Sequence, residues 1–245
     1  MSMPTLTAER TAHAVRLDSV TKTYGNVTAL SGVSHDFPRG GFTAIMGPSG
    51  SGKSTFLHCA SGLDQPSKGS VRIGGVDLGG LSEAKRTRLR RERIGFVFQS
   101  FNLIPSMDVE QNIVLPLQLA GTAPDPGWLA EVVRRVGLQD RLAHRPSELS
   151  GGQQQRAAVA RALITRPEVV FADEPTGALD PRTARDVLRL LREAVDQTGQ
   201  TVVLVTHDPM AAAWADSVVF LSGGRIVDEL VAPSPTTVMT RWETL

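Results

Sequence analysis

The sequence lacks any long hydrophobic run. No segment approaches the roughly 18 consecutive apolar residues that a membrane-spanning helix requires, and residues 1–14 contain no apolar leader segment. We therefore expect a chain that neither crosses a membrane nor is exported through a signal peptide. The polar residues 1–14 are typical of a flexible extension ahead of a globular domain.

Cysteine is almost absent as well. Cys59 is the only one among 245 residues, which excludes an internal disulfide framework and a cysteine-based zinc site. We predict that Cys59 is buried as a small hydrophobic side chain. The formal net charge of only +1 provides no general attraction to nucleic acid, so we expect no nucleic-acid partner.

Lysine is scarce, with four lysines against 22 arginines. The densest basic segment, KRTRLRRER, covers residues 85–93. Two interpretations remain open for this segment: a solvated helix face, or a surface that contacts lipid headgroups or a partner protein.

Three compact apolar runs predict buried strands, at residues 42–46 (FTAIM), 169–173 (VVFAD) and 201–206 (TVVLVT). Each run is paired with a helical pattern, which is typical of an α/β core whose parallel sheet is covered on both faces. Between residues 15 and 45, short alternating stretches separated by turn residues predict antiparallel strands. The segment SVRIGG at residues 70–75 adds another strand.

The remaining segments follow different patterns. Residues from about 100 to 165 predict a helical subdomain inserted into the α/β core, ending before Pro167. The segment SVVFLSGGRIVDEL, residues 217–230, predicts a hairpin with Gly223 and Gly224 at the turn. We expect the globular domain to cover residues 15–235 and to be followed by a C-terminal tail at 236–245.

The segment GPSGSGKST, residues 47–55, has the phosphate-loop pattern of glycine, four residues, glycine, lysine, and serine or threonine. It follows a predicted strand and opens a predicted helix, where backbone N–H groups and the helix dipole favour phosphate. Lys53 supplies a positive charge for the outer phosphates, and the Ser54 hydroxyl supplies a Mg²⁺ ligand. The candidate phosphate-binding residues are Gly47, Pro48, Ser49, Gly50, Ser51, Gly52, Lys53, Ser54 and Thr55.

Three further candidates stand where apolar strands end. Asp173 closes the run VVFAD, and we expect Mg²⁺ between Ser54 and Asp173. Glu174 follows directly, at a position from which a carboxylate can take the proton of an attacking water. His207 ends the run TVVLVTH. Parallel strands bring their carboxyl ends to one edge of a sheet, so these side chains and the phosphate loop are expected to converge.

An ordered set of motifs makes the sequence resemble the ATP-binding cassette, the ATPase subunit of ABC transporters. The motifs are Tyr24, GPSGSGKST, Gln99 at the end of RIGFVFQ, LSGGQ at 149–153, VVFADEP, ALD at 178–180, and His207. LSGG also occurs at 221–224, between two strand-like runs, where it predicts only a turn. The first copy differs because Gln153, a long helical pattern and VVFADEP follow it.

The resemblance implies ATP as the bound nucleotide, with Mg²⁺, and assigns roles to the remaining residues. Tyr24 would stack on adenine, Gln99 would touch the Mg²⁺ or the attacking water, and Asp180 would signal across a dimer interface. His207 would steady the γ-phosphate. Two cassettes would pair head to tail, so that a partner cassette's phosphate loop faces a helix start formed by Ser150, Gly151, Gly152 and Gln153.

Within the family, FNLIPSMDVEQNIVLPL and FADEPTGALD are most similar to the LolD/MacB branch, which serves lipoprotein release, macrolide and antimicrobial-peptide export, and cell-division permease complexes. The resemblance implies a peripheral subunit on the cytoplasmic face of the cell membrane. Its expected partners are an integral-membrane permease and a second copy of the chain or a paralogous cassette. The segment after Gln99 would form the groove for a permease helix. Two alternatives remain: a force-transmitting regulatory complex, or a soluble ATPase acting on nucleic acid.

Overall fold

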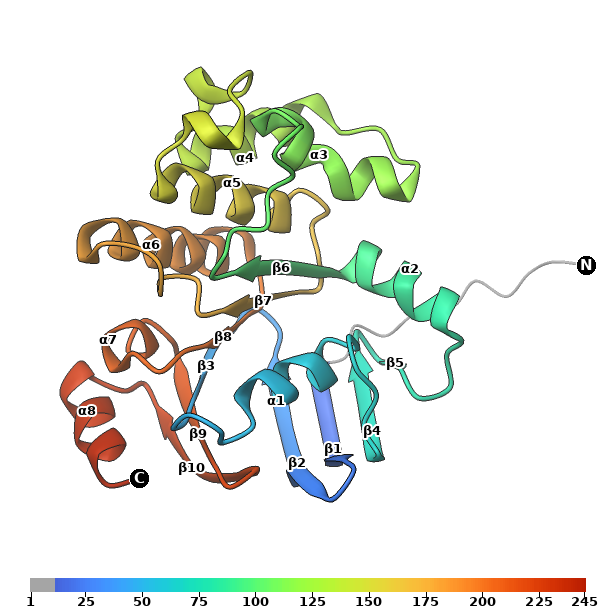
Figure 1. Ribbon diagram of the computed structural model, residues 1–245, viewed down its shortest axis with the longest axis vertical. Helices are drawn as coiled ribbons and strands as arrows, with labels where there is room; N and C mark the ends of the chain where they lie inside the picture. The colour runs from blue at the N-terminus through green and yellow to red at the C-terminus, as the bar shows by residue number, and fades with distance from the viewer. Residues whose placement is uncertain (1–11) are drawn as a thin grey trace, which may run out of the picture.

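The computed structural model describes residues 12–245, whose arrangement is shown in Figure 1. Residues 1–11, which make up most of the predicted N-terminal extension, lie outside the described residues. His13 and Ala14 do not belong to the predicted extension, because the first strand begins at His13 and Ala14 is fully buried. Within residues 12–245, no helix has the length and apolar character needed to cross a membrane.

The strands of the described chain form two sheets, one of four strands and one of six. The four-stranded sheet is antiparallel with order β2-β1-β4-β5; its strands are β1 (His13–Tyr24), β2 (Val27–Pro38), β4 (Lys68–Ile73) and β5 (Val76–Asp77). The six-stranded sheet has the order β10-β9-β3-β8-β7-β6; its strands are β3 (Phe42–Met46), β6 (Ile94–Phe98), β7 (Val169–Asp173), β8 (Val202–Val205), β9 (Ser217–Ser222) and β10 (Arg225–Val231).

The six-stranded sheet confirms the predicted parallel α/β core. The pairs β3/β8, β3/β9, β7/β8 and β6/β7 are all parallel. Only β10 runs antiparallel, as the second arm of the predicted hairpin with β9. Gly223 and Gly224, both with positive φ, form its turn, so the second LSGG copy is a hairpin turn as expected.

Both faces of this sheet are buried, which explains why its strands are uniformly apolar. In β7, Val170 and Ala172 belong to one hydrophobic cluster, while Val169 and Phe171 belong to the other. Successive side chains of a strand point to opposite faces, so one strand supplies both clusters. One cluster is shared with the helices α5 and α6, the other with α1 and the antiparallel sheet. A run such as VVFAD is therefore apolar on both faces of the sheet, and its first polar residue is the last one.

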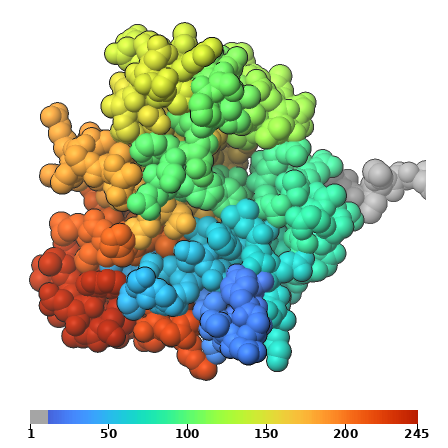
Figure 2. Space-filling model, in the orientation of Figure 1, coloured from blue at the N-terminus to red at the C-terminus, as the bar shows by residue number. Residues whose placement is uncertain are grey.

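The helices surround and extend this core, as Figure 1 shows. Their bounds are α1 (Lys53–Ala60), α2 (Glu83–Arg93), α3 (Val109–Ala120), α4 (Pro126–Val136), α5 (Gly151–Leu163), α6 (Pro181–Thr198), α7 (Pro209–Ala212) and α8 (Pro235–Glu243), with short 3-10 turns at Gln139–Arg141 and Pro146–Glu148. Helices α3 and α4 both pack on α5, and α5 also contacts β6 and α6. In Figure 2 their residues, coloured green to yellow, form the upper part of the visible face.

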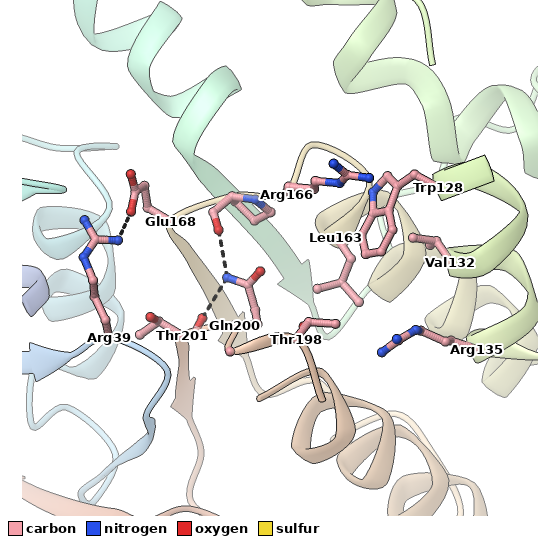
Figure 3. A pocket seen from close by; sticks show the side chains of 12 residues that line it. Arg39, Trp128, Val132, Arg135, Leu163, Arg166, Glu168, Thr198, Gln200 and Thr201 are labelled. Atoms are coloured by element: carbon pink, nitrogen blue, oxygen red, sulfur yellow. Dashed lines mark hydrogen bonds and ion pairs between the residues drawn. The ribbon is translucent and has the colours of Figure 1, made fainter. Parts of the chain in front are cut away.

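A cavity of about 430 Å³ lies between the helical segment and the starting ends of β7 and β8. Figure 3 shows Trp128 on one side of it and Gln200 on the other. Trp128 Nε1 donates to the carbonyl of Ile164 (3.0 Å), and the buried Gln200 amide donates to the carbonyl of Pro167 (3.0 Å). Side-chain to backbone bonds therefore fix the loop between α5 and β7 from both sides.

The tail predicted for residues 236–245 is instead the helix α8. Ser234 caps it through a bond from Thr237 N–H (3.1 Å), and Pro235 occupies its first turn. Val238 is fully buried, and α8 packs against α7. Serine followed by proline is a helix-start signal, so the sequence contained the information that a helix begins at Pro235. This helix ends at Glu243.

The basic segment at residues 85–93 is only in part a solvated face. Arg88 is well exposed and pairs with Glu92 on its own helix (2.7 Å). Arg86, by contrast, is buried, and Arg90 donates to the carbonyl of Gly62 (2.6 Å) while Arg91 donates to that of Leu119 (2.5 Å). These arginines tie α2 to the turn after α1 and to the end of α3.

Cys59 is free and fully buried in α1, as predicted. Burial raises its pKa to about 11, and only the thiolate attacks a disulfide reagent. We expect no labelling of the native protein by a chromogenic disulfide reagent at pH 8 and full labelling in guanidinium chloride. Rapid labelling of the native protein would contradict this placement, and Cys59→Ser provides the blank.

Candidate functional site

A cavity of about 640 Å³ opens where the carboxyl ends of β3, β7 and β8 meet. Its lining comes from the start of β2, the phosphate loop, the ends of β7 and β8, and α8. The lining residues are Val27, Thr28, Ala29, Ser49, Gly50, Gly52, Lys53, Ser54, Thr55, Asp173, Glu174, Val205, His207 and Trp242. The convergence predicted from the three strand ends is therefore present.

The phosphate loop turns directly from β3 into α1. Gly52 stands at the N-cap of α1 with φ 102°, a conformation that other residues rarely adopt. A Cβ at this position would lie 2.5 Å from the carbonyl oxygen of Ala29, so the loop can pass β2 only with glycine here. The turn leaves the first N–H groups of α1 without helical partners beside the cavity.

Lys53 folds back over its own loop. Its Nζ donates to the carbonyls of Gly47 (2.6 Å) and Pro48 (3.0 Å). Burial is the main reason why the pKa of Lys53 lies below its ordinary value, while the carboxylates of Glu174 and Asp173 act in the opposite direction. Two carbonyl oxygens thus hold the ammonium group at the cavity wall, where phosphate oxygens can replace them.

Asp173 and Ser54 provide hard oxygen donors on the same cavity. Burial, followed by repulsion from Glu174, raises the pKa of Asp173, and a nearby cation would offset both effects. Among residues 12–245, no group of three or more His, Cys, Asp or Glu side chains could hold a metal by itself. Mg²⁺ commonly takes one or two protein ligands and completes its shell with phosphate oxygens and water, so this donor pair fits Mg²⁺ together with a bound nucleotide.

Glu174 has an unusual backbone conformation. Its φ of 46° lies in the left-handed region, which is uncommon for a residue other than glycine and often marks a functional site. Its N–H donates to the carbonyl of Val205 on β8 (2.9 Å), which fixes this conformation. Glu174 Oε1 lies 2.7 Å from Nδ1 of His207, whose ring is 67% exposed. The two predicted residues are therefore in direct contact.

Tyr24 and Gln99 do not line the cavity. The Tyr24 hydroxyl donates to Asp64 (2.7 Å), and Lys22 Nζ lies 4.9 Å from the ring centroid. The ring is 48% exposed, which leaves area for a stacked base. The amide of Gln99 lies against Gly177, in the loop after β7. In this arrangement the side chain of Gln99 is not assembled with Ser54 and Asp173.

The segment LSGGQ also lies apart from the cavity, because none of residues 149–153 lines it. Ser150 caps α5 in a reciprocal capping box with Gln153, with bonds of 3.3 Å and 2.9 Å. Gly152 packs closely on α6, since a Cβ there would meet Thr183 Cγ2 at 2.2 Å. Gly151 has more space, and its nearest neighbour is Phe101. Within residues 12–245, the Ser150 hydroxyl has only this capping bond to Gln153.

Asp180 has a similar capping position at the start of α6. Its Oδ1 accepts from the N–H groups of Arg182 (3.0 Å) and Thr183 (3.1 Å). Hydrogen bonds from Thr183 are the main reason why the pKa of Asp180 lies below its ordinary value. The structure therefore gives Asp180 a structural role in helix capping, whatever it does at an interface.

Sequence reasoning missed two residues near the site. Trp242 of α8 lines the cavity although it is far from every motif in the sequence, and no pattern could place it there. Gln155 of α5 is fully buried and donates to the carbonyls of Phe98 (3.2 Å) and Pro175 (2.6 Å). It bridges the strand end before Gln99 to the residue after Glu174. The one sequence signal that could have identified Gln155 was its position directly after LSGGQQ.

A sequence profile described as ABC transporter matches residues 30–177, which include the phosphate loop, LSGGQ and the Asp173–Glu174 pair. The chain belongs to the ABC transporter family. It is an ATP-binding domain of this family, and its enzymatic activity is ATP hydrolysis. The fold agrees, because the solved structures similar to it are cassettes of the same α/β architecture.

Relatives with assigned names lie in the LolD/MacB branch that the motifs predicted. The chain is 43% identical over 220 residues to lipoprotein-releasing system ATP-binding protein LolD 1 of Rhodospirillum rubrum, covering 87% of this chain and 97% of the relative. It is 42% identical over 228 residues to the macrolide export ATP-binding/permease protein MacB of Marinobacter nauticus, covering 91% of this chain. The match covers only 35% of that MacB.

Among solved structures, the chain is similar to the cassette MJ0796 in a dimeric post-hydrolysis state bound to ADP and Pi. The TM-score is 0.81 at 40% sequence identity, covering 90% of this chain and 99% of that one. At this identity the likeness extends beyond the fold, and it supports the ATP-binding role of the cavity.

We expect Gln155→Leu to lower the free energy of unfolding by about 1–3 kcal/mol, because two buried carbonyls lose a donor. Gln154→Leu is the matched control, since Gln154 makes only one bond, to the carbonyl of Leu149 at the start of α5 (3.2 Å), and should cost about 1 kcal/mol or less. Urea denaturation measures both. Equal losses of unfolding free energy in the two variants would show that the two Gln155 bonds contribute no more to stability than the single Gln154 bond.

Proposed function

We propose that this chain powers an ABC exporter or extractor of the LolD/MacB type by closing as a head-to-tail dimer on ATP and opening after hydrolysis. The observation that carries the proposal is the separation of the LSGGQ helix start from the cavity of its own chain. A helix start with free N–H groups is suited to phosphate, and two-fold symmetry would bring it to the partner's cavity. The dimeric MJ0796 relative supports this arrangement.

In the proposed reaction, the phosphate loop binds the phosphate oxygens through its N–H groups, and Lys53 Nζ exchanges its loop carbonyls for those oxygens. Ser54 and Asp173 would hold Mg²⁺, which would neutralise charge on the phosphates. Glu174 accepts the proton of the attacking water. His207 contacts the γ-phosphate, and Ser150 with the N–H groups of Gly151 and Gly152 contacts it from the partner.

A groove of about 420 Å³ supports a permease partner. Apolar side chains from β6, α3 and the turn after α1 line it, among them Phe98, Leu119 and Leu63, and α2 adds Arg90 and Arg91. Its lining includes parts of the segment after Gln99 that the resemblance assigned to permease binding. Leu119 (60% exposed) and Leu63 (44% exposed) both line the groove, and apolar side chains exposed side by side mark a surface suited to a partner. We propose that an amphipathic permease helix occupies this groove and holds the chain at the cytoplasmic face of the membrane.

The cargo is proposed from the relatives' names alone, because a cassette does not touch it. Lipoproteins and macrolides are both amphiphilic or hydrophobic, which is the class of cargo we propose.

Glu174→Gln should reduce phosphate release by at least about a hundredfold, because the amide cannot accept the water proton. ATP binding should persist, and the ATP-bound variant should elute as a dimer in size-exclusion chromatography. Lys53→Ala should instead lose ATP binding. A Glu174→Gln variant that stays monomeric at saturating ATP and Mg²⁺ contradicts the dimer mechanism.

The role of Ser150 can be separated from its capping role. Adding Ser150→Arg to Glu174→Gln should abolish the ATP dimer while leaving monomer ATP binding intact. Asp108→Arg is the matched control, because Asp108 caps α3 in the same kind of capping box. Both changes remove a cap worth about 1 kcal/mol, but only the first obstructs the proposed interface. Equal loss of the dimer in both variants would reduce LSGGQ to a helix cap.

Leu119→Asp should abolish copurification of the membrane subunit with this chain, since it places a charge in the apolar groove, and should leave basal ATPase activity unchanged. Val231→Asp is the control, because Val231 is 78% exposed on β10 and does not line the groove. Retained copurification by Leu119→Asp would exclude this groove as the binding surface.

A further inference from the structure

Thr206 lies between the end of β8 and His207, and its side chain is fully buried. Its Oγ1 donates to Glu174 Oε2 (3.2 Å) and accepts from the N–H of Asp208 (3.1 Å). A hydroxyl has one hydrogen to donate. Because the Asp208 N–H occupies an acceptor site of Oγ1, the hydroxyl hydrogen is free to point at the carboxylate. The backbone thus orients the hydroxyl, and the hydroxyl orients Glu174.

The two oxygens of Glu174 have partners of very different mobility. Oε2 is held by Thr206, whose N–H donates to the carbonyl of Ile45 on β3 (3.1 Å). Thr206 cannot leave without breaking the end of the parallel sheet. Oε1 is held by His207, whose imidazole is 67% exposed. The ring can rotate away at little cost, while the threonine cannot.

A carboxylate that acts as a base must offer a free lone pair to water in a fixed direction. Each Glu174 oxygen accepts one of these two bonds and keeps a second lone pair, and departure of either partner leaves both lone pairs of its oxygen free. The exposed ring is the partner that can leave, and the buried hydroxyl then continues to fix the plane of the carboxylate. Departure of Thr206 instead would leave the base attached to a mobile side chain.

We infer that Thr206 is a positioning residue for the ATPase reaction: it fixes Glu174 Oε2 throughout the cycle, so that when His207 moves to the phosphate, Oε1 becomes the proton-accepting atom. The inference rests on the proposed role of Glu174 as the base. In the step itself, the water oxygen forms a bond to the γ-phosphorus and the water proton passes to Oε1. The bond from the γ-phosphorus to the bridging oxygen breaks, and its electron pair leaves with ADP.

The test compares steady-state ATP hydrolysis by the wild-type chain and four variants. Thr206→Val removes the hydroxyl and keeps the branched shape, and we expect kcat to fall about tenfold to a hundredfold with KM for ATP within about twofold. Thr206→Ser restores the hydroxyl and should recover most of the rate. Glu174→Gln should be inactive, and this variant tests the role of Glu174 as the base independently of Thr206.

Thr201→Val is the matched structural control. Thr201 is also buried, lies at the opposite end of the same strand, and accepts from the N–H of Gly40 (3.1 Å). Both valine variants lose one buried hydroxyl that accepts a backbone N–H, so both should lower the melting temperature. Only Thr206→Val should lower kcat. If Thr206→Val does not fold, Thr206→Ala and Thr206→Ser form the deciding pair, with alanine slow and serine active.

The outcomes separate the inference from the proposed function. Wild-type kcat in Thr206→Val, with Glu174→Gln inactive, overturns the role of Thr206 and leaves the base in place. Full activity in Glu174→Gln overturns the base itself. Equal losses of kcat in Thr206→Val and Thr201→Val, or failure of serine to restore the rate, show a structural role only and also overturn the inference.

Discussion

The parallel pairing of β3, β7 and β8 is the constraint on which the site depends. The three strands run in the same direction, and their register aligns Ile45 and Asp173 with Val205. The residues that follow each strand therefore leave the sheet at one edge and one level. The phosphate loop, the Asp173–Glu174 pair and His207 are far apart in sequence but follow these strands. Burial of both faces holds the strands in place, so the geometry of the site follows from the packing of the core.

The sequence predicted this part of the molecule well for a physical reason. The strand at residues 42–46 begins after glycines and ends at the phosphate loop, and the strand at 169–173 ends at its first carboxylate, so the apolar pattern alone marks their bounds. The orientation of the side chains beyond the strand ends was harder to predict from the sequence. Gln99 follows β6 as expected, yet its amide lies against Gly177. A strand pattern specifies which edge a residue reaches, but the rotamer depends on neighbours that are distant in sequence.

The helix α8 and Trp242 illustrate the same limit. The start signal at Ser234 and Pro235 was local and could have been used, whereas the contact of Trp242 with the cavity depends on how α8 packs against α7. Gln155 is a similar case. Its two bonds join α5 to the ends of two strands, and the sequence shows only a third consecutive glutamine. Tertiary contacts of single polar side chains are decided by packing and not by periodicity.

Capping and anion binding are compatible functions of the LSGGQ segment. An α-helix leaves its first N–H groups without internal partners. Ser150 Oγ accepts from Gln153 N–H, and the N–H groups of Gly151 and Gly152 stay available for a ligand. Because Ser150 Oγ is the acceptor in this 3.3 Å bond, its own hydrogen remains available to donate to an anion. Gly152 is required for a further reason, since Thr183 leaves no room for a side chain.

Lys53 and Glu174 both have hydrogen-bond partners within the protein. Lys53 is bound to loop carbonyls, and Glu174 is bound to Thr206 and His207. A nucleotide therefore exchanges existing hydrogen bonds for new ones, and the net gain of each exchange is smaller than the bond itself. Lys53 and His207 can return to these partners when the phosphates leave. Since either set of partners satisfies the charges of Lys53 and Glu174, neither side chain is left unpaired when the nucleotide is absent.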